Sequence, residues 1–344
     1  IDATDLRAAI VAEGGNLGFT QLGRIEAEQV GVRMNTDAID NSAGVDMSDH
    51  EVNLKILLDR VVERGELNVK ARNQTLAQMT EEVATLVMQN NDAHGRQISR
   101  DRVRSQKDIF QFGRAIAFIE RTFGVRRLSL GLPKHSELRR RAEVGEGLTR
   151  PELAVLGAWV KMFVYQQLMA GDPTQIPGFK DMLHAYFPTL IREKYAADID
   201  THMLANEIAM TKATTHVVAD AGCAFVPIMI ETTGTNVADI VGALFKAQKL
   251  ARIDEVRSTL EQQRTSVSLA TLTRGWVEVQ EGARMVALYW LSAKGRIPTD
   301  KELASMLPVV DEVFKFESER DQLRVTQVIE EMKKETGDNG NGGY

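Results

Sequence analysis

Residues 10–58 constrain the fold of this chain most, because two short apolar segments there lead into small and amide residues. The first, residues 8–12 of a strand predicted over 5–12, stops at Glu-Gly-Gly-Asn (13–16). The second, a strand predicted over 31–35, leads to Asn-Ser-Ala-Gly (41–44). Ligands of α/β sheets bind beyond the carboxyl ends of such strands, and glycines let the backbone approach them closely. The pattern therefore predicts two neighbouring strand ends that form one wall of a ligand site.

The same segments resemble the paired signatures in the nucleotide-binding domain of glutamate dehydrogenases. The sequences Gly-Asn-Leu-Gly-Phe-Thr-Gln-Leu-Gly-Arg-Ile-Glu (15–26) and Asp-Asn-Ser-Ala-Gly-Val-Asp (40–46) are similar to the very large bacterial NAD-specific glutamate dehydrogenases. A later segment, Leu-Thr-Arg-Pro-Glu-Leu-Ala-Val-Leu (148–156), resembles the helical C-terminal region of that family. The resemblance covers nearly the whole chain, densely up to residue 58 and more thinly beyond residue 100.

The resemblance implies an oxidoreductase of amino-acid catabolism that converts L-glutamate, NAD and water to 2-oxoglutarate, ammonia and NADH. It assigns four residues to the cofactor: Gly14, Gly15, Asn16 and Asn41. It assigns Ser48 to a substrate carboxylate. In this family the lysine that polarises the substrate and the acidic residue that transfers protons lie upstream of the nucleotide domain. Nothing precedes Ile1 here, and the Gly-x-Gly-x-x-Gly loop is missing, so we expect a C-terminal fragment that is inactive alone.

Each assigned polar residue also has a purely structural interpretation. Asn16 and Asn41 are of a type that tolerates left-handed backbone and closes turns. The spacing of Ser48 and Glu51 matches a capping box, which predicts that a helix begins at Ser48. Cap and ligand contact are compatible there, because a helix N-terminus offers free N–H groups to an anion. The residues alone leave these alternatives open, and the resemblance favours the cofactor role of the two asparagines.

Other polar and aromatic groups are predicted to be structural. The acids and histidine at 46–51 suit the first turn of a helix, and the family needs no metal. Cys223 lies in an apolar stretch as an inert thiol, and the basic run 139–141 is predicted to be a solvated connector. Five histidines show no metal-ligand spacing: His94, His135, His184, His202 and His216. Three aromatic residues at helical spacing indicate core or interface packing: Trp276, Tyr289 and Trp290.

Composition excludes several other classes of protein. A formal charge of −6 argues against nucleic acid as a partner, since phosphate binding needs a basic face. No apolar run approaches the roughly 20 residues that span a bilayer, and no signal peptide is visible. The single cysteine suits a reducing cytoplasm, where we place the protein. The resemblance adds the expected partners: glutamate or 2-oxoglutarate, ammonia, the upstream part of the same polypeptide, and further copies in a homo-oligomer.

The periodicity predicts a predominantly α protein. Beyond residue 65 the alternation of strand and helix stops, and apolar residues recur with the 3.6-residue helical period. Capping boxes are predicted at 149–152 and 299–302, and a connector over 128–147. Besides the helix from Ser48, helices are predicted over 20–29, 69–89, 108–123, 149–169, 178–186, 188–195, 199–220, 236–250, 253–263, 269–294 and 310–334.

These elements divide the chain into four predicted parts. Residues 1–60 are expected to be the C-terminal remnant of an α/β Rossmann-like nucleotide-binding domain, and 61–127 the helices that return from it. Residues 128–336 form a helical C-terminal domain, which we hypothesise to serve assembly or regulation, and 337–344 a disordered tail. The alternative hypothesis is a non-catalytic helical interaction or oligomerisation module with a vestigial site. Such a module would self-associate without binding NAD or glutamate.

Overall fold

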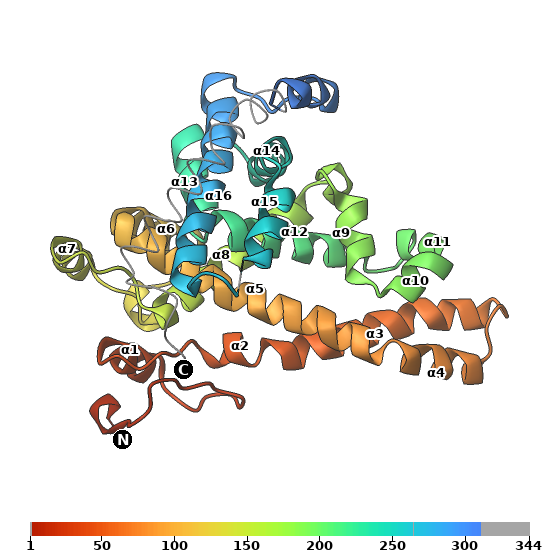
Figure 1. The fold of residues 1–344 in the computed structure, drawn as a ribbon, viewed down its shortest axis with the longest axis horizontal. Coiled ribbons are helices and arrows are strands. Elements are labelled where there is room, and N and C mark those ends of the chain that lie inside the picture. The colour runs from red at the N-terminus through yellow and green to blue at the C-terminus, as the bar shows by residue number, and fades with distance from the viewer. Residues whose placement is uncertain (1, 264, 311–344) are drawn as a thin grey trace.

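The computed structural model describes residues 2–263 and 265–310, and this part is predominantly α, as predicted (Figure 1). Short 3-10 turns occur at η1 (Ala3–Asp5), η2 (Arg127–Leu130) and η3 (Pro173–Gln175). A further helical segment spans 300–310. The α-helices are α1 (Gln21–Gln29), α2 (Asp37–Asp40), α3 (Ser42–Glu63), α4 (Val69–Gln78), α5 (Thr80–Lys107), α6 (Ile109–Phe123), α7 (His135–Glu143), α8 (Arg150–Ala170), α9 (Phe179–Tyr186), α10 (Thr189–Lys194), α11 (Ala196–Asp200), α12 (Ala205–Ala221), α13 (Phe225–Thr233), α14 (Val237–Leu250), α15 (Ile253–Gln262) and α16 (Leu269–Ala293).

The two predicted strands are reduced to a single parallel bridge between Ile10 and Arg33 in the described part of the chain. The Val11 N–H donates to the Arg33 carbonyl at 2.9 Å, and the Arg33 N–H donates to the Ala9 carbonyl at 2.9 Å. The side chain of Ile10 is 68% exposed, so the prediction of a buried strand over 5–12 is wrong. A lone strand pair buries no apolar face by itself, since a stable sheet needs further strands or a covering helix.

The predicted helix start at Ser48 is also wrong. Helix α3 begins six residues earlier, at Ser42, with Asn41 at its N-cap position. The Ser48 hydroxyl instead donates to the Gly44 carbonyl of the preceding turn at 3.4 Å. A tertiary contact explains the early start, because the Asn91 amide of α5 donates to the Ser42 hydroxyl at 2.8 Å. The hydrogen bond from Asn91 stabilises a helix start at Ser42 more than the predicted capping box stabilises a start at Ser48.

Helix α5 lies between the N-terminal segment and the other helices (Figure 1). It runs beside α3, from which it is separated in the chain by α4, and it also packs against α8, α12 and α16. The single helix predicted over 69–89 is wrong, since α4 ends and α5 begins around a break at Met79. The face of α5 toward its neighbours carries buried polar residues as well as apolar ones, and these are Gln97, Asp101, Arg104 and Ser105.

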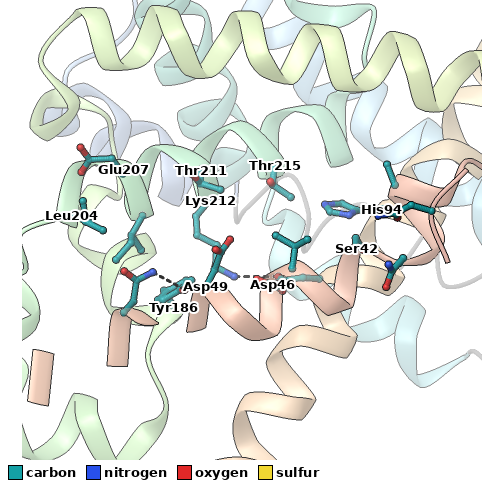
Figure 2. Close-up of a pocket in the computed structure, with 17 residues that line it drawn as sticks. Ser42, Asp46, Asp49, His94, Tyr186, Leu204, Glu207, Thr211, Lys212 and Thr215 are labelled. Carbon is teal, nitrogen blue, oxygen red and sulfur yellow. Dashed lines mark hydrogen bonds between the residues drawn. The ribbon is translucent and has the colours of Figure 1, made fainter. Parts of the chain in front are cut away.

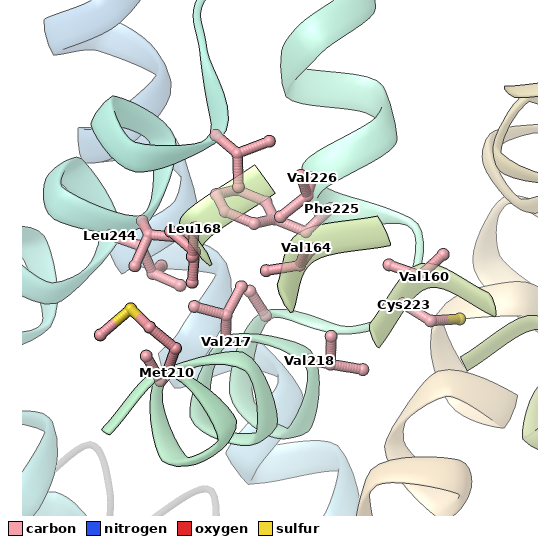
Figure 3. Packing of buried hydrophobic residues seen from close by; sticks show 14 of the residues in the cluster. Val160, Val164, Leu168, Met210, Val217, Val218, Cys223, Phe225, Val226 and Leu244 are labelled. Atoms are coloured by element: carbon pink, nitrogen blue, oxygen red, sulfur yellow. The ribbon is translucent and has the colours of Figure 1, made fainter. Parts of the chain in front are cut away.

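The main hydrophobic core forms where α8, α12, α13 and α14 meet (Figure 3). Helix α8 begins with the predicted capping box, in which the Thr149 N–H donates to Glu152 Oε2 at 2.7 Å. Within the described residues, α8 is the helix that could cross a membrane alone by length and composition, yet many of its apolar residues, such as Leu153, Leu156 and Val160, are buried against its neighbours. A helix that is apolar on most sides belongs in a core. The core residues of these helices include Val160, Val164, Leu168, Met210, Val217, Phe225 and Leu244.

Several predicted helices are confirmed within one or two residues at their ends, among them α1, α6, α8, α14, α15 and α16. The predicted helix over 199–220 is instead α11 and α12, and α13 was not predicted. The predicted connector over 128–147 contains η2 and α7. Trp276 and Trp290 are buried in the core, whereas Tyr289 is 52% exposed and does not pack there. The predicted 310–334 helix, beyond its first residue, and the 337–344 tail lie outside the described residues.

Arg141 is buried, which corrects the prediction of a fully solvated basic run at 139–141. Its guanidinium forms a bidentate pair with Glu152, with Nη1–Oε2 at 2.7 Å and Nη2–Oε1 at 2.9 Å. Glu152 is also the acidic member of the α8 capping box. The pair therefore ties α7 to the first turn of α8.

We predict that Arg141→Met destabilises the protein by about 3–5 kcal/mol, because it leaves the Glu152 carboxylate buried without its partner. Arg139→Met is the matched control, since Arg139 is a neighbouring exposed arginine, and its effect should stay within about 0.5 kcal/mol. Urea unfolding of both variants measures the difference. Equal unfolding midpoints for the two variants would contradict the role of the pair.

Candidate functional site

A cavity of about 620 Å³ lies between α3 and the helices α5, α9 and α12 (Figure 2). Asn16 and Asn41, two of the residues predicted to bind a cofactor, both line it. Asn41 directly precedes α3, and Asn16 lies in the loop after the parallel bridge. The structure therefore brings the two sequence signatures to one place, as the spacing of the motifs suggested.

Glu13 holds the loop that carries Asn16. Its buried carboxylate accepts hydrogen bonds from Arg24 Nε at 2.6 Å and from the Phe19 N–H at 3.0 Å. The loop is joined to α2 because the Asp37 carboxylate accepts the Leu17 N–H at 2.9 Å. This bond is the largest cause of the lowered pKa of Asp37. Glu13 was not predicted as a site residue, although a charged residue directly before two glycines was a visible signal.

Both asparagines lie in turns, as their structural interpretation predicts, but neither side chain takes the expected part in the turn. Asn41 occupies the N-cap position of α3, but its side chain makes no capping hydrogen bond. Asn16 has no left-handed backbone, and its neighbour Leu17 takes that conformation instead, with φ of 62°. Within the described residues, neither carboxamide has a hydrogen-bond partner. The lack of a side chain at Gly44 leaves space for the Asn41 carboxamide, since a Cβ at position 44 would lie 2.9 Å from Asn41 Oδ1.

The other predicted site residues lie outside this cavity. Gly14 and Gly15 are exposed, and a Cβ built on either would meet no atom within 4 Å, so their backbone is open to a ligand. Ser48 is exposed on α3 and does not line the cavity. It lies in the second turn of α3, so the free N–H groups of a helix N-terminus are not at Ser48.

The opposite wall of the cavity carries residues that no sequence motif predicted. Lys212 of α12 donates to Asn90 Oδ1 of α5 at 3.1 Å, and the Asn90 amide donates to Asp46 Oδ2 of α3 at 2.7 Å. This chain of bonds joins three helices across the cavity (Figure 2). Burial lowers the pKa of Lys212, and the nearby Asp46 carboxylate partly offsets that effect. The residues are too far apart in sequence for any local pattern to connect them.

His50 belongs to the protein core. It is fully buried, and its ring stacks on that of Tyr186 with centroids 4.1 Å apart. Burial lowers the pKa of His50 and raises that of Tyr186. The Tyr186 hydroxyl, which lies at the cavity, accepts a hydrogen bond from Asn53 at 2.9 Å. The 46–51 cluster lies in the second and third turns of α3, and the prediction of a first helical turn there is wrong.

Two family models match the chain. "Bacterial NAD-glutamate dehydrogenase, catalytic domain" matches residues 1–101, and "Glutamate dehydrogenase, C-terminal" matches residues 145–336. The chain belongs to the bacterial NAD-specific glutamate dehydrogenase family. Asn16, Asn41 and Asp46 lie in the first matched region, whereas Tyr186 and Lys212 lie in the second. The cavity is therefore lined by both regions of this family.

Three similar proteins carry the name "NAD-specific glutamate dehydrogenase". The chain is 38% identical to the protein of Halomonas elongata over 261 residues, which is 76% of the chain and 16% of the relative. It is 39% identical to that of Mycobacterium tuberculosis over 241 residues, 70% of the chain and 15% of the relative. It is 38% identical to the protein of Pseudomonas aeruginosa over 243 residues, which is 71% of the chain and 15% of the relative. The chain thus spans about one sixth of the length of these relatives.

His94 supplies a pH-dependent test of the cavity wall. Burial and the charges of Lys161 and Lys212 lower the pKa of His94 to about 3, from an ordinary value of 6.5. Between these values the unfolded chain binds a proton that the folded protein does not bind. The stability that neutral His94 contributes is therefore complete above pH 6.5 and decreases as the pH falls, by about 1.4 kcal/mol for each pH unit.

We predict that His94→Gln flattens the dependence of the unfolding free energy on pH below 6.5, since glutamine does not titrate. Urea unfolding of both proteins at several pH values between about 7 and 5 gives the two slopes. Carboxylates titrate equally in both proteins and cancel in the comparison. Parallel curves for wild type and variant would show that His94 is protonated in the folded protein as readily as in the unfolded chain.

Proposed function

We propose that this chain forms one wall of the cofactor and substrate site of an NAD-dependent glutamate dehydrogenase. The observation that carries the proposal is the convergence of Asn16 and Asn41, from separate signatures, on one cavity with free carboxamides. The two family matches and the names of the three relatives support it. The reaction would convert L-glutamate, NAD and water to 2-oxoglutarate, ammonia and NADH.

The residues at the cavity fit a nicotinamide nucleotide. A carboxamide offers both donors and an acceptor, which suits the amide and ribose hydroxyl groups of such a ligand. Asn16 and Asn41 would orient that end of the molecule, and the open backbone of Gly14 and Gly15 would allow its close approach. NAD supplies the hydride acceptor when bound. The role of these four residues is to hold and orient the bound nucleotide.

Ser48 is proposed to contact a substrate carboxylate. Its hydrogen bond to Gly44 is 3.4 Å long, well beyond the usual 2.7–2.8 Å of a hydroxyl donor, so the hydroxyl remains available to a ligand. The contact depends on this hydroxyl alone, since Ser48 is not at a helix N-terminus. We assign no catalytic residue to this chain and place the lysine and the acid of the reaction upstream.

The N-terminal segment is proposed to be the end of a Rossmann-like nucleotide-binding domain, within residues 1–60. The parallel pairing of Ile10 with Arg33 supports this, because parallel strands at the ligand edge characterise that fold. A cytoplasmic homo-oligomer, with the helical region in assembly or regulation, completes the proposal. The thiol of Cys223 is buried, and this burial raises its pKa well above the ordinary value. Such a thiol is inert and suits a reducing compartment.

The test is glutamate-dependent reduction of NAD by the whole polypeptide that contains this chain. We predict that Asn41→Ala raises the KM for NAD by up to about ten-fold, the worth of one neutral hydrogen bond, with a smaller effect on the KM for glutamate. Asn16→Ala should act in the same direction. Asn73→Ala is the control, because Asn73 is an exposed asparagine on α4 and does not line the cavity.

The alternative interaction module makes a different prediction for the same experiments. It predicts no NAD reduction by the whole polypeptide, no NAD affinity of this chain, and self-association of the helical region. The proposed enzyme predicts activity of the whole polypeptide and weak NAD binding by this chain without turnover. Unchanged kinetics in both asparagine variants would contradict the cofactor wall.

A further inference from the structure

One face of α12 borders the cavity that Asn16 and Asn41 line (Figure 2). The residues of this face, with those just before the helix, recur every three or four positions, as neighbours on one helix face do. They include polar side chains that no structural role accounts for. The members of this face are Leu204, Glu207, Ile208, Thr211, Lys212 and Thr215.

The ammonium of Lys212 lacks a counter-ion among the described residues. Its one hydrogen bond, to Asn90 Oδ1 at 3.1 Å, is to a neutral amide, and no carboxylate lies within 4.0 Å. The side chain is partly buried, and desolvation lowers its pKa despite the nearby Asp46. A buried charge without a partner costs free energy, which an anion at this position would offset.

His94 of α5 is a second unsatisfied group at the same cavity. Its Nδ1 atom is buried and has no hydrogen-bond partner within the described part of the chain. The neutral ring can present an N–H donor to a ligand in the appropriate tautomer. The charges of Lys161 on α8 and of Lys212 on α12 both lower the pKa of His94, so cationic groups from two other helices act on this histidine.

Three carboxylates line the cavity, those of Asp46, Asp49 and Glu207, and Asp49 lies nearer to Lys212 than to His94 in Figure 2. Glu207 is at the opposite end of the cavity from His94 in Figure 2, and Thr215 lies between Lys212 and His94. The carboxylate of Asp46 already accepts the Asn90 amide at 2.7 Å. An anionic group therefore fits best between Lys212 and His94, where the Thr215 hydroxyl can also donate.

We propose that Lys212, with His94, binds an anionic group of a ligand in this cavity, either a carboxylate or a phosphate. This inference rests on the proposed function, in which the carboxylate would belong to glutamate or 2-oxoglutarate and the phosphate to NAD. The helical region matched by the C-terminal family model then contributes a binding residue to the site of the nucleotide domain. It is more than an assembly module.

The experiment compares Lys212→Met, Lys212→Arg and wild type in the whole polypeptide. Calorimetric titrations with NAD and with 2-oxoglutarate are run separately, together with the melting temperature of each protein. We predict that Lys212→Met weakens binding of one or both ligands by about ten- to a hundred-fold, the worth of a charge-assisted hydrogen bond. Lys212→Arg, which keeps the charge, should retain most of the affinity. Lys249→Met, an exposed lysine on α14, is the matched control and should change neither titration.

The titrations show which anionic group binds at Lys212 and whether the anion site exists. A loss confined to NAD assigns the phosphate, and a loss confined to 2-oxoglutarate assigns the carboxylate. Unchanged affinities for both ligands overturn the anion site, as does a loss of both that arginine does not restore and that accompanies a lower melting temperature. If the wild type binds a ligand but does not reduce NAD with glutamate, the proposed function fails while the anion site stands or falls by its own titration. If the wild type binds neither ligand, both proposals fail.

Discussion

The position of α5 between the N-terminal segment and the helical region is the constraint on which the site depends. On the side of the N-terminal segment, Asn91 donates to the Ser42 hydroxyl at 2.8 Å and fixes the start of α3. On the side of the helical region, the fully buried carboxylate of Asp101 accepts hydrogen bonds from Arg104 Nη1 of α5 itself and from the Cys223 N–H after α12, each at 3.0 Å. Buried polar bonds of this kind are costly to break, so they hold one arrangement of the helices. The cavity exists because α3 and α12 are both tied to α5.

The segment 148–156, which resembled the family, has a physical role in that arrangement. Thr149 and Glu152 cap α8, and Arg150 between them reaches back to the N-terminal segment. Its Nε donates to Asn35 Oδ1 at 2.8 Å and its Nη1 to the Ser99 hydroxyl at 2.9 Å. The motif therefore joins the end of the second bridging segment to α5 and α8. These contacts form a junction between the two regions matched by the family models.

Local signals in the sequence predicted the helices whose ends depend on nearby residues. The side chains of Thr20, Asp108 and Asn236, the first residues of three predicted helices, accept N–H bonds at the starts of α1, α6 and α14. The Ser48 signal failed because a contact from a distant helix decides where α3 begins. Lys212 could not be predicted as part of the site, because only packing across more than a hundred residues places it there. Asn16 and Asn41, by contrast, belong to motifs that are close in the sequence and lie on one side of the cavity.

Hydrogen exchange measured by mass spectrometry on the whole polypeptide tests the central claim most directly, namely that both regions of the chain form the wall of one ligand site. Exchange is compared without ligand and with saturating NAD and 2-oxoglutarate. The account predicts slower exchange in peptides covering residues 13–49 and, equally, in peptides covering 204–221 of the helical region, with no change at α15. Protection confined to the first segment would contradict a wall shared with α12.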